Sequence, residues 1–374
     1  MKNTFRSFLV LSLLASTFLL SACQAVPKVE STGNYVLQIT QVDTTQFPMV
    51  DVYISIRDAS GEPVVVNTGK LQLLENGQPV SNQKVLGAGE AGPLTTMLLI
   101  DNSGSMNFVN KLDSAKAVAN EFLDQMRPGD QAGVIVFNTK VNVLQDVTAD
   151  REALVKAIDS ISARDDTSIY DALATAIGIL NPLPGRKAII VMTDGMDNSS
   201  VATPEEALGS IGFGGLSIST IGFGQAAEDE AETDKYKGID EATLRMIAEN
   251  AGGQYGFAED KAELSALYSQ MRRTLQSEAV ISYVTPLSLR DGVQRALTIT
   301  LSDKFIGIGG ESQTSFNPGG LVPEVAQPAS WITFGVIMAG LLVLLFIPII
   351  ITKFTNKEPK KSKKKSKIKI TLKD

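Results

Sequence analysis

Residues 97–105 read Met-Leu-Leu-Ile-Asp-Asn-Ser-Gly-Ser, an apolar run followed by side chains that carry oxygen. The apolar part has the length and composition of a short strand buried inside a sheet. Asp101, Ser103 and Ser105 follow at alternate positions, where that strand ends. One carboxylate and two hydroxyls offer only hard oxygen ligands, which suit Mg²⁺ or Mn²⁺ better than Zn²⁺. The stretch therefore predicts a divalent-cation site at the end of a buried strand, although this spacing alone is a weak signal.

The hydrophobic period around this stretch predicts an α/β unit over residues 94–277. Short apolar strands alternate there with segments whose apolar residues recur at helical spacing. The expected strands are 96–100, 132–137, 141–144, 188–192 and 216–221, and the expected helices are 115–126, 150–161, 170–180, 241–250 and 261–275. This alternation is typical of a parallel sheet covered by helices, to which 141–144 adds an antiparallel edge strand.

Two further polar segments lie where they can join the first. Thr167 belongs to the loop 165–171, just before an expected helix, and Asp194 comes shortly after the apolar strand 188–192. Ligands of open parallel sheets bind at the carboxyl ends of the strands. We therefore expect Asp101, Thr167 and Asp194 to meet at one edge of the sheet.

Three polar segments together resemble the von Willebrand factor type A domain with its metal-ion-dependent adhesion site. They are Asp101-Asn-Ser-Gly-Ser105, Thr167-Ser-Ile-Tyr-Asp-Ala172 and Thr193-Asp-Gly-Met-Asp197. The resemblance covers roughly residues 94–276. Further matching segments are Ile221-Gly-Phe-Gly224 and Gly252-Gly-Gln-Tyr255. The resemblance implies a doubly wound, Rossmann-like α/β fold with a mainly parallel sheet and helices on both faces.

The resemblance also implies how each residue acts on the metal. Ser103, Ser105 and Thr167 would bind Mg²⁺ or Mn²⁺ directly, while Asp101 and Asp194 would act mostly through water or as hydrogen-bond acceptors. Neutral hydroxyls compensate the cation's charge poorly, and Mg²⁺ keeps water-filled positions, so an Asp or Glu of a partner protein can complete the coordination. There are two alternatives: the metal has a structural role and binds no partner, or the site holds no metal.

The composition argues against catalysis. The chain has no histidine and one cysteine, which excludes Ser-His and Cys-His nucleophiles, histidine metal sites and any disulfide within the chain. A metal-dependent hydrolase would need a general base, for which Asp165, Asp166 and Asp197 are available. These are more simply loop and helix-capping residues. We therefore expect a binding protein without enzymatic activity.

The first 22 residues predict a secretory signal peptide. Lys2 and Arg6 precede an apolar stretch, 8–20, that is too short to span a bilayer. Leu20-Ser-Ala-Cys23 resembles the bacterial lipoprotein cleavage box, which implies cleavage before Cys23 and lipid attachment to its sulfur. The alternative is an ordinary secretory signal with an incidental cysteine. Residues 23–33 are then a tether.

Residues 331–352 predict a transmembrane helix. These 22 residues contain no charged side chain. As a helix they would span about 33 Å, enough for a hydrocarbon core of about 30 Å. A buried core helix is the alternative.

Residues 353–374 are rich in lysine, and positive charge beside a span stays cytoplasmic. The whole chain has a net charge of −7, so the part outside this tail is acidic. We expect that part to lie outside the cytoplasm of a bacterial cell, held at the cell membrane. The lysines serve orientation and contact with anionic lipids, or alternatively dock a cytoplasmic partner. Without interleaved aromatic residues they offer no stacking platform, so we expect no nucleic-acid binding.

Two segments flank the α/β unit, 34–93 and 278–316, and runs within them have the apolar–polar period of half-buried strands: 35–42, 50–56, 280–284 and 296–301. Asn76-Gly77, between 71–75 and 78–80, predicts a hairpin. The second segment is too short for a stable domain of its own. We expect one β-sandwich into which the α/β unit is inserted, with two separate modules as the alternative. The Pro/Gly-rich residues 317–330 are expected to form a stalk.

These expectations describe a membrane-anchored protein that binds or adheres to a protein partner through a metal. The competing interpretation is an assembly or regulatory subunit of a membrane complex, in which the type A domain is a non-enzymatic scaffold.

Overall fold

The computed structural model describes residues 35–65, 68–81, 83–87, 90–164, 166–224, 238–303, 308–320, 332, 334–342 and 344. The chain forms two compact units, one up to Glu324 and one from Val325 onward. All named helices and strands belong to the first unit.

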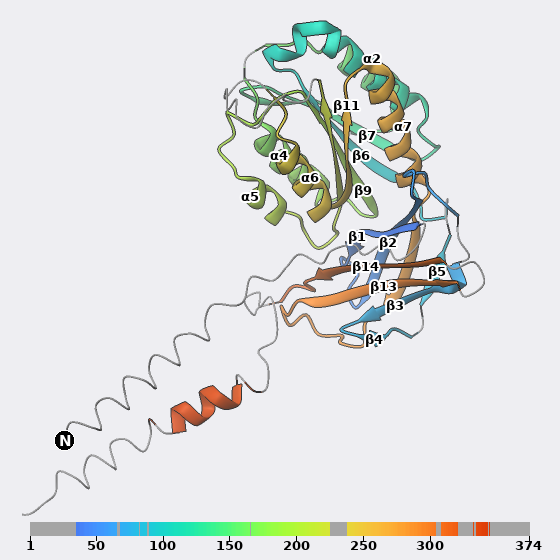
Figure 1. The fold of residues 1–374 in the computed structure, drawn as a ribbon, viewed down its shortest axis with the longest axis vertical. Coiled ribbons are helices and arrows are strands. Elements are labelled where there is room, and N and C mark those ends of the chain that lie inside the picture. Colours follow the sequence, from blue (N-terminus) through green and yellow to red (C-terminus); the bar gives the residue numbers. More distant parts are fainter. Residues whose placement is uncertain are drawn as a thin grey trace, which may run out of the picture. The chain divides into compact units, whose positions relative to one another are not determined.

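A six-stranded mixed sheet forms the centre of the α/β unit (Figure 1). Its order is β11 (Gly252–Ala258), β10 (Ser217–Phe223), β9 (Arg186–Thr193), β6 (Leu94–Asp101), β7 (Gln131–Phe137) and β8 (Val141–Thr148). All neighbouring pairs are parallel except β7 and β8. Every residue of the central strands β6 and β9 is buried, including the apolar runs 97–100 and 188–192 that predict buried strands.

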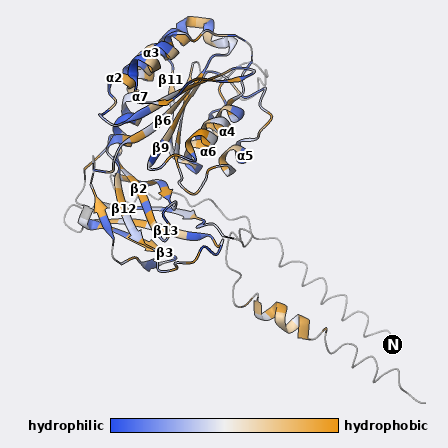
Figure 2. Ribbon diagram, turned by 180° about the vertical axis from the view of Figure 1, so that it is seen from behind, coloured by the Kyte–Doolittle hydropathy of each residue, from blue (hydrophilic) through white to orange (hydrophobic). Residues whose placement is uncertain are grey.

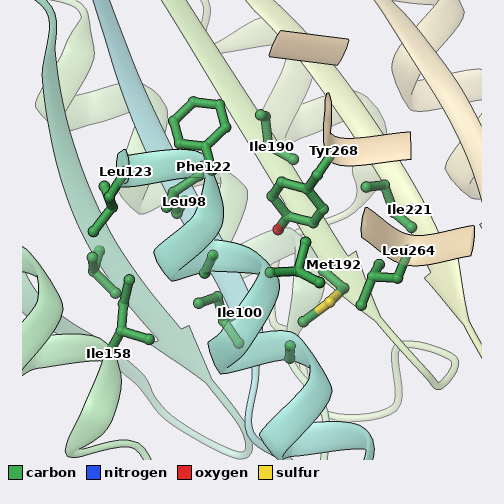
Figure 3. Packing of buried hydrophobic residues seen from close by; sticks show 14 of the residues in the cluster. Leu98, Ile100, Phe122, Leu123, Ile158, Ile190, Met192, Ile221, Leu264 and Tyr268 are labelled. Carbon is green, nitrogen blue, oxygen red and sulfur yellow. The ribbon is translucent and has the colours of Figure 1, made fainter. Parts of the chain in front are cut away.

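Helices cover both faces of this sheet, which confirms the expected α/β class (Figure 1). One face carries α2 (Lys111–Asp124), α3 (Arg151–Asp159) and α7 (Lys261–Gln276), and the other carries α4 (Ile169–Leu180), α5 (Pro204–Gly209) and α6 (Glu241–Asn250). Figure 3 shows the hydrophobic core between the sheet and the face that carries α2, α3 and α7. In this core, Phe122 of α2 packs edge to face against Tyr268 of α7, with ring centroids 6.3 Å apart. Alternate residues of β6 serve the two cores, because successive side chains of a strand point to opposite faces.

The strands before and after the α/β unit pair with one another in two four-stranded sheets. The first sheet has the order β1 (Tyr35–Asp43), β2 (Met49–Asp58), β12 (Ala279–Val284) and β5 (Lys84–Leu86), and the second has the order β14 (Ile308–Phe316), β13 (Arg295–Asp303), β3 (Leu71–Glu75) and β4 (Gln78–Pro79). One hydrophobic core takes residues from both sheets, which therefore pack as a sandwich. The described residues of this unit also form two 3-10 helices, η1 (Thr68–Lys70) and η2 (Gly104–Asn110).

The sandwich is attached at the amino ends of the parallel strands. The amide of Gln41, in β1, donates to the carbonyl oxygens of Gly185 (2.9 Å) and Gly214 (2.7 Å), and its oxygen accepts from the backbone N–H of Lys187 (3.0 Å). These three residues lie at or just before the starts of β9 and β10. The carboxyl ends of these strands, where ligands bind in such sheets, therefore point away from the sandwich.

Several elements differ from the sequence expectations. The edge strand β8 continues to Thr148, and no expectation covered α5, β11 or β14. Residues 317–320, expected in the stalk, contact the folded part, since Gly292 N–H donates to Gly319 O at 3.1 Å. The carbonyl of Pro318 also accepts from Arg290 at 2.6 Å. Any stalk thus begins after these residues, because their backbone groups are paired within the sandwich.

The second unit contributes a few helical residues, 332, 334–342 and 344, which are hydrophobic in Figure 2. Among the described residues, no helix combines the length and the apolar character that crossing a membrane requires. Positions 331, 333, 343 and 345–352 of the expected span lie outside the described residues, as do the signal segment, Cys23, the tether up to residue 33 and the lysine-rich tail.

Candidate metal centre

Asp101 is fixed where two central strands end. It is the last residue of β6, and Thr193 is the last residue of the neighbouring β9. The Thr193 hydroxyl donates to Oδ2 of Asp101 at 2.6 Å, and the backbone N–H of Ser103 donates to Oδ1 at 2.8 Å. The carboxylate is fully buried, so these two hydrogen bonds hold it in one orientation.

The two serines connect this point to the next loop. Oγ of Ser103 and Oγ of Ser105 lie 2.9 Å apart, and the Ser105 hydroxyl donates to Oδ1 of Asp194 at 2.7 Å. Four of the five expected metal ligands, Asp101 included, therefore form one hydrogen-bonded cluster at the carboxyl edge of the sheet.

Thr167 reaches the same edge from the loop before α4. Its backbone N–H donates to Oδ1 of Asn198 at 3.0 Å, and its carbonyl accepts from the backbone N–H of Asn198 at 3.1 Å. A side-chain carbon built on Gly195 would lie 3.6 Å from Oγ1 of Thr167. The hydroxyl thus lies beside the peptide that follows Asp194, and the side chain is 4% exposed.

The electrostatics of the cluster favour a cation. Burial, followed by the nearby Asp194 carboxylate, raises the pKa of Asp101 to about 7, against hydrogen bonds from Thr193 and Ser103 that lower it. Two carboxylates placed this close cost free energy when both are ionised. A divalent ion at this place would supply the compensating charge.

Lys111, which was not among the expected site residues, supplies positive charge at this place in the structure. Its Nζ lies 2.7 Å from Oδ2 of Asp194. Lys111 is the first residue of α2, where the positive end of the helix dipole disfavours a cation. The sequence feature that could have pointed to this residue is a lysine at the start of the helix, six residues after Ser105.

The set of donors fits the expected cation. Among the described residues, no group of three or more Asp, Glu or Cys side chains could hold a metal by itself. A metal here would depend on the hydroxyls of Ser103, Ser105 and Thr167 together with the two carboxylates. All of these are oxygen donors, which are the ligands that Mg²⁺ and Mn²⁺ take.

Of the three carboxylates considered for a hydrolase, the structure shows a different role for Asp197. Asp197 accepts from the backbone N–H groups of Ile169 (2.6 Å) and Tyr170 (3.2 Å) at the start of α4. Asp166 is exposed, and Asp165 lies outside the described residues. Asp197 therefore acts as a capping group for α4.

Comparison with known proteins identifies the α/β unit. Residues 96–196 match the family model of the von Willebrand factor type A domain, so the chain contains such a domain. The UPF0353 protein of Nocardia farcinica is 28% identical over 231 residues, which are 54% of this chain and 67% of the relative. UPF0353 proteins of Mycobacterium tuberculosis match over 61% of their own length.

Solved structures are also similar to this chain, at low sequence identity. A von Willebrand factor type A protein from Catenulispora acidiphila is 16% identical, with a TM-score of 0.44, over 78% of this chain and 75% of that one. Proximal thread matrix protein 1 from the mussel byssus, solved with a zinc-occupied MIDAS motif, is 19% identical with a TM-score of 0.44, over 54% of this chain and 50% of that one.

Proposed function

We propose that this chain is a membrane-anchored, extracytoplasmic protein that binds a protein partner through a divalent cation. The observation that carries the proposal is the cluster of Asp101, Ser103, Ser105 and Asp194 at the carboxyl edge of the sheet, with Thr167 beside it. The sandwich is attached at the opposite ends of the strands, so its described residues do not cover this edge.

The chemistry of the cluster favours binding over catalysis. Ser103, Ser105 and Thr167 would hold Mg²⁺ or Mn²⁺, with Asp101 and Asp194 balancing part of its charge. When bound, the cation supplies a positive charge with room for one more oxygen ligand, because Mg²⁺ in proteins usually keeps water-filled positions. An Asp or Glu carboxylate of a partner protein is such a ligand.

The surface beside the cluster is suited to a protein partner. Phe108 and Val109, which follow Ser105 in η2, are 68% and 89% exposed, and Met196, two residues after Asp194, is 39% exposed. Exposed large apolar side chains next to a polar site are typical of surfaces that another protein covers. The partner that we propose therefore presents a carboxylate and apolar surface around it.

The two anchors that we propose are the lipid on Cys23 and the helix 331–352. With the lysine-rich tail in the cytoplasm, they place the binding edge outside it. A host protein, a neighbouring cell or an envelope protein would all be within the reach of such an anchored domain.

A metal-dependent pulldown tests this function. Wild-type chain on beads is incubated with envelope or host-matrix extracts in Mg²⁺, and the bound protein is eluted with EDTA. The variant Ser103→Ala is expected to lose this protein, because it lacks one proposed ligand, while Ser160→Ala, at the exposed end of α3, retains it. Equal capture in EDTA and in Mg²⁺ would contradict the proposal.

A further inference from the structure

The ion pair between Lys111 and Asp194 lies inside the protein. Its two atoms are 2.7 Å apart, the side chain of Asp194 is 0% exposed and that of Lys111 is 20% exposed. Exposed ion pairs contribute little to stability, but a carboxylate that loses its partner in a buried place is strongly destabilising. Lys111 is therefore important to the cluster even though it is not one of the expected ligands.

The fold provides room for this ammonium group. Gly224 follows β10, and a side-chain carbon built on it would lie 3.1 Å from Nζ and 3.5 Å from Cε of Lys111. A side chain at this position would press on the end of the lysine, whereas the glycine leaves the lysine unhindered as it reaches Asp194 from α2. The position opposes the helix dipole, so the attraction of Asp194 is what favours the lysine there.

We propose that Lys111 is a built-in counter-cation of the centre, which neutralises Asp194 in the metal-free protein and lowers the affinity for divalent cations. This inference rests on the proposed metal site and assigns a further residue to it. An ammonium group held beside a metal ligand repels an incoming divalent ion and competes for the same carboxylate.

Lys111 also changes the charge that a partner meets. Asp101 and Asp194 together carry two negative charges when ionised, which a divalent cation alone would cancel. With Lys111 present, the loaded centre keeps one positive charge, which a single carboxylate balances. Lys111 thus weakens metal binding and strengthens the attraction for a partner's Asp or Glu.

The test compares three variants of the full-length chain. Lys111→Met removes the charge and keeps most of the apolar stem, Lys111→Arg keeps the charge, and Lys116→Met is the matched control. Lys116 lies on the same helix, and its Nζ donates to the carbonyl of Ile161 at 2.9 Å rather than to the cluster. Binding of Mg²⁺ is measured by calorimetry and binding of Mn²⁺ by electron paramagnetic resonance.

We expect Lys111→Met to bind both ions at least about tenfold more tightly than wild type, because the competing charge is gone. Lys111→Arg and Lys116→Met are expected to stay within about threefold of wild type. Without metal, Lys111→Met should unfold at a lower temperature than wild type, because Asp194 loses its partner, and saturating Mg²⁺ should close this gap.

Acetate serves as the probe for a carboxylate. At saturating Mg²⁺ it should raise the unfolding temperature of wild type more than that of Lys111→Met, with sodium chloride of equal ionic strength as the control. An equal effect of acetate on both would overturn the role of Lys111 toward carboxylates.

Equal or weaker Mg²⁺ binding by Lys111→Met would overturn the counter-cation proposal while leaving the metal site intact. If neither wild type nor any variant binds Mg²⁺ or Mn²⁺, both this inference and the proposed function are wrong. The two failures are therefore distinguishable.

Discussion

At the residue scale, the ionised form of Asp101 is disfavoured, because the side chain is fully buried and a second carboxylate, that of Asp194, lies nearby. The pKa of Asp101 is raised to about 7, above the ordinary value of an aspartate, so the folded, metal-free chain binds its proton more tightly than the unfolded chain does. Stability from this group is therefore fully present at low pH and is lost as the pH rises toward 7.

The first prediction follows from this sign. In EDTA, the unfolding free energy of the wild-type chain should fall between about pH 4 and pH 7, and Asp101→Asn should remove most of this dependence because an amide does not titrate. Urea unfolding at a series of pH values, each with wild type and variant, measures the difference. A parallel pH dependence in both proteins would show that Asp101 is not the group responsible.

Local sequence revealed part of the centre and missed the rest for a physical reason. Asp101, Ser103 and Ser105 stand out because a strand end and alternate spacing are local features. Lys111 was missed because its partner, Asp194, lies far away in the chain, and only the packing of α2 against β9 and β10 brings the two together.

At the scale of elements, η2 is the segment with unusual backbone geometry. Val109 and Asn110 have φ values of +55° and +56°, in the left-handed region. Asparagine tolerates this region, but a β-branched residue does not. The loop beside the candidate metal centre therefore holds a valine in a conformation that costs free energy, and it also exposes that side chain to water.

A second prediction concerns this valine. Val109→Gly should stabilise the chain by about 1 kcal/mol, because glycine adopts a positive φ without a steric penalty. Val201→Gly is the control, since Val201 is 93% exposed and has no positive φ. Thermal unfolding of both variants measures the effect, and a destabilised Val109→Gly would show that the valine side chain makes a contact that outweighs the strain.

Elements with a clear hydrophobic period were predictable, and those formed by pairing were not. The helix over 241–250 and the Asn76-Gly77 hairpin agree with expectation, the latter with positive φ at both turn residues. β14 reads Ile-Gly-Gly-Glu-Ser-Gln-Thr-Ser-Phe, which has no strand period, and it is a strand because it pairs with β13 along its whole length.

At the scale of the whole molecule, one buried ion pair joins the ends of the α/β unit to its sheet. Arg186, the first residue of β9, lies 2.7 Å from Glu278, and the two side chains are 1% and 4% exposed. Arg186 also donates to the carbonyl oxygens of Gly92 (3.1 Å) and Leu275. The entry to and the exit from the inserted unit are therefore held by one side chain.

A third prediction tests this junction. Glu278→Gln should cost about 3 kcal/mol of unfolding free energy, because it leaves the buried guanidinium without its counter-charge. Arg151→Met, which removes the exposed pair with Asp124, should cost less than about 1 kcal/mol. Urea denaturation of the two variants compares them, and equal losses would contradict the importance of burial.

A fourth prediction concerns the proposed anchor. Mass spectrometry of the mature protein from a bacterial membrane fraction should find Cys23 as the first residue, carrying lipid on its sulfur. The variant Cys23→Ser should lose this modification. An unmodified terminus at or beyond Cys23 in wild type would contradict lipidation.

The central claim is that a divalent cation binds at the carboxyl edge of the α/β sheet. Anomalous diffraction from crystals of residues 34–320 soaked in Mn²⁺ tests it most directly, because manganese marks its own position. We predict one strong anomalous peak within bonding distance, about 2.2 Å, of the hydroxyl oxygens of Ser103, Ser105 and Thr167. A peak elsewhere on the molecule, or none at this centre with Mn²⁺ in excess, would contradict the claim.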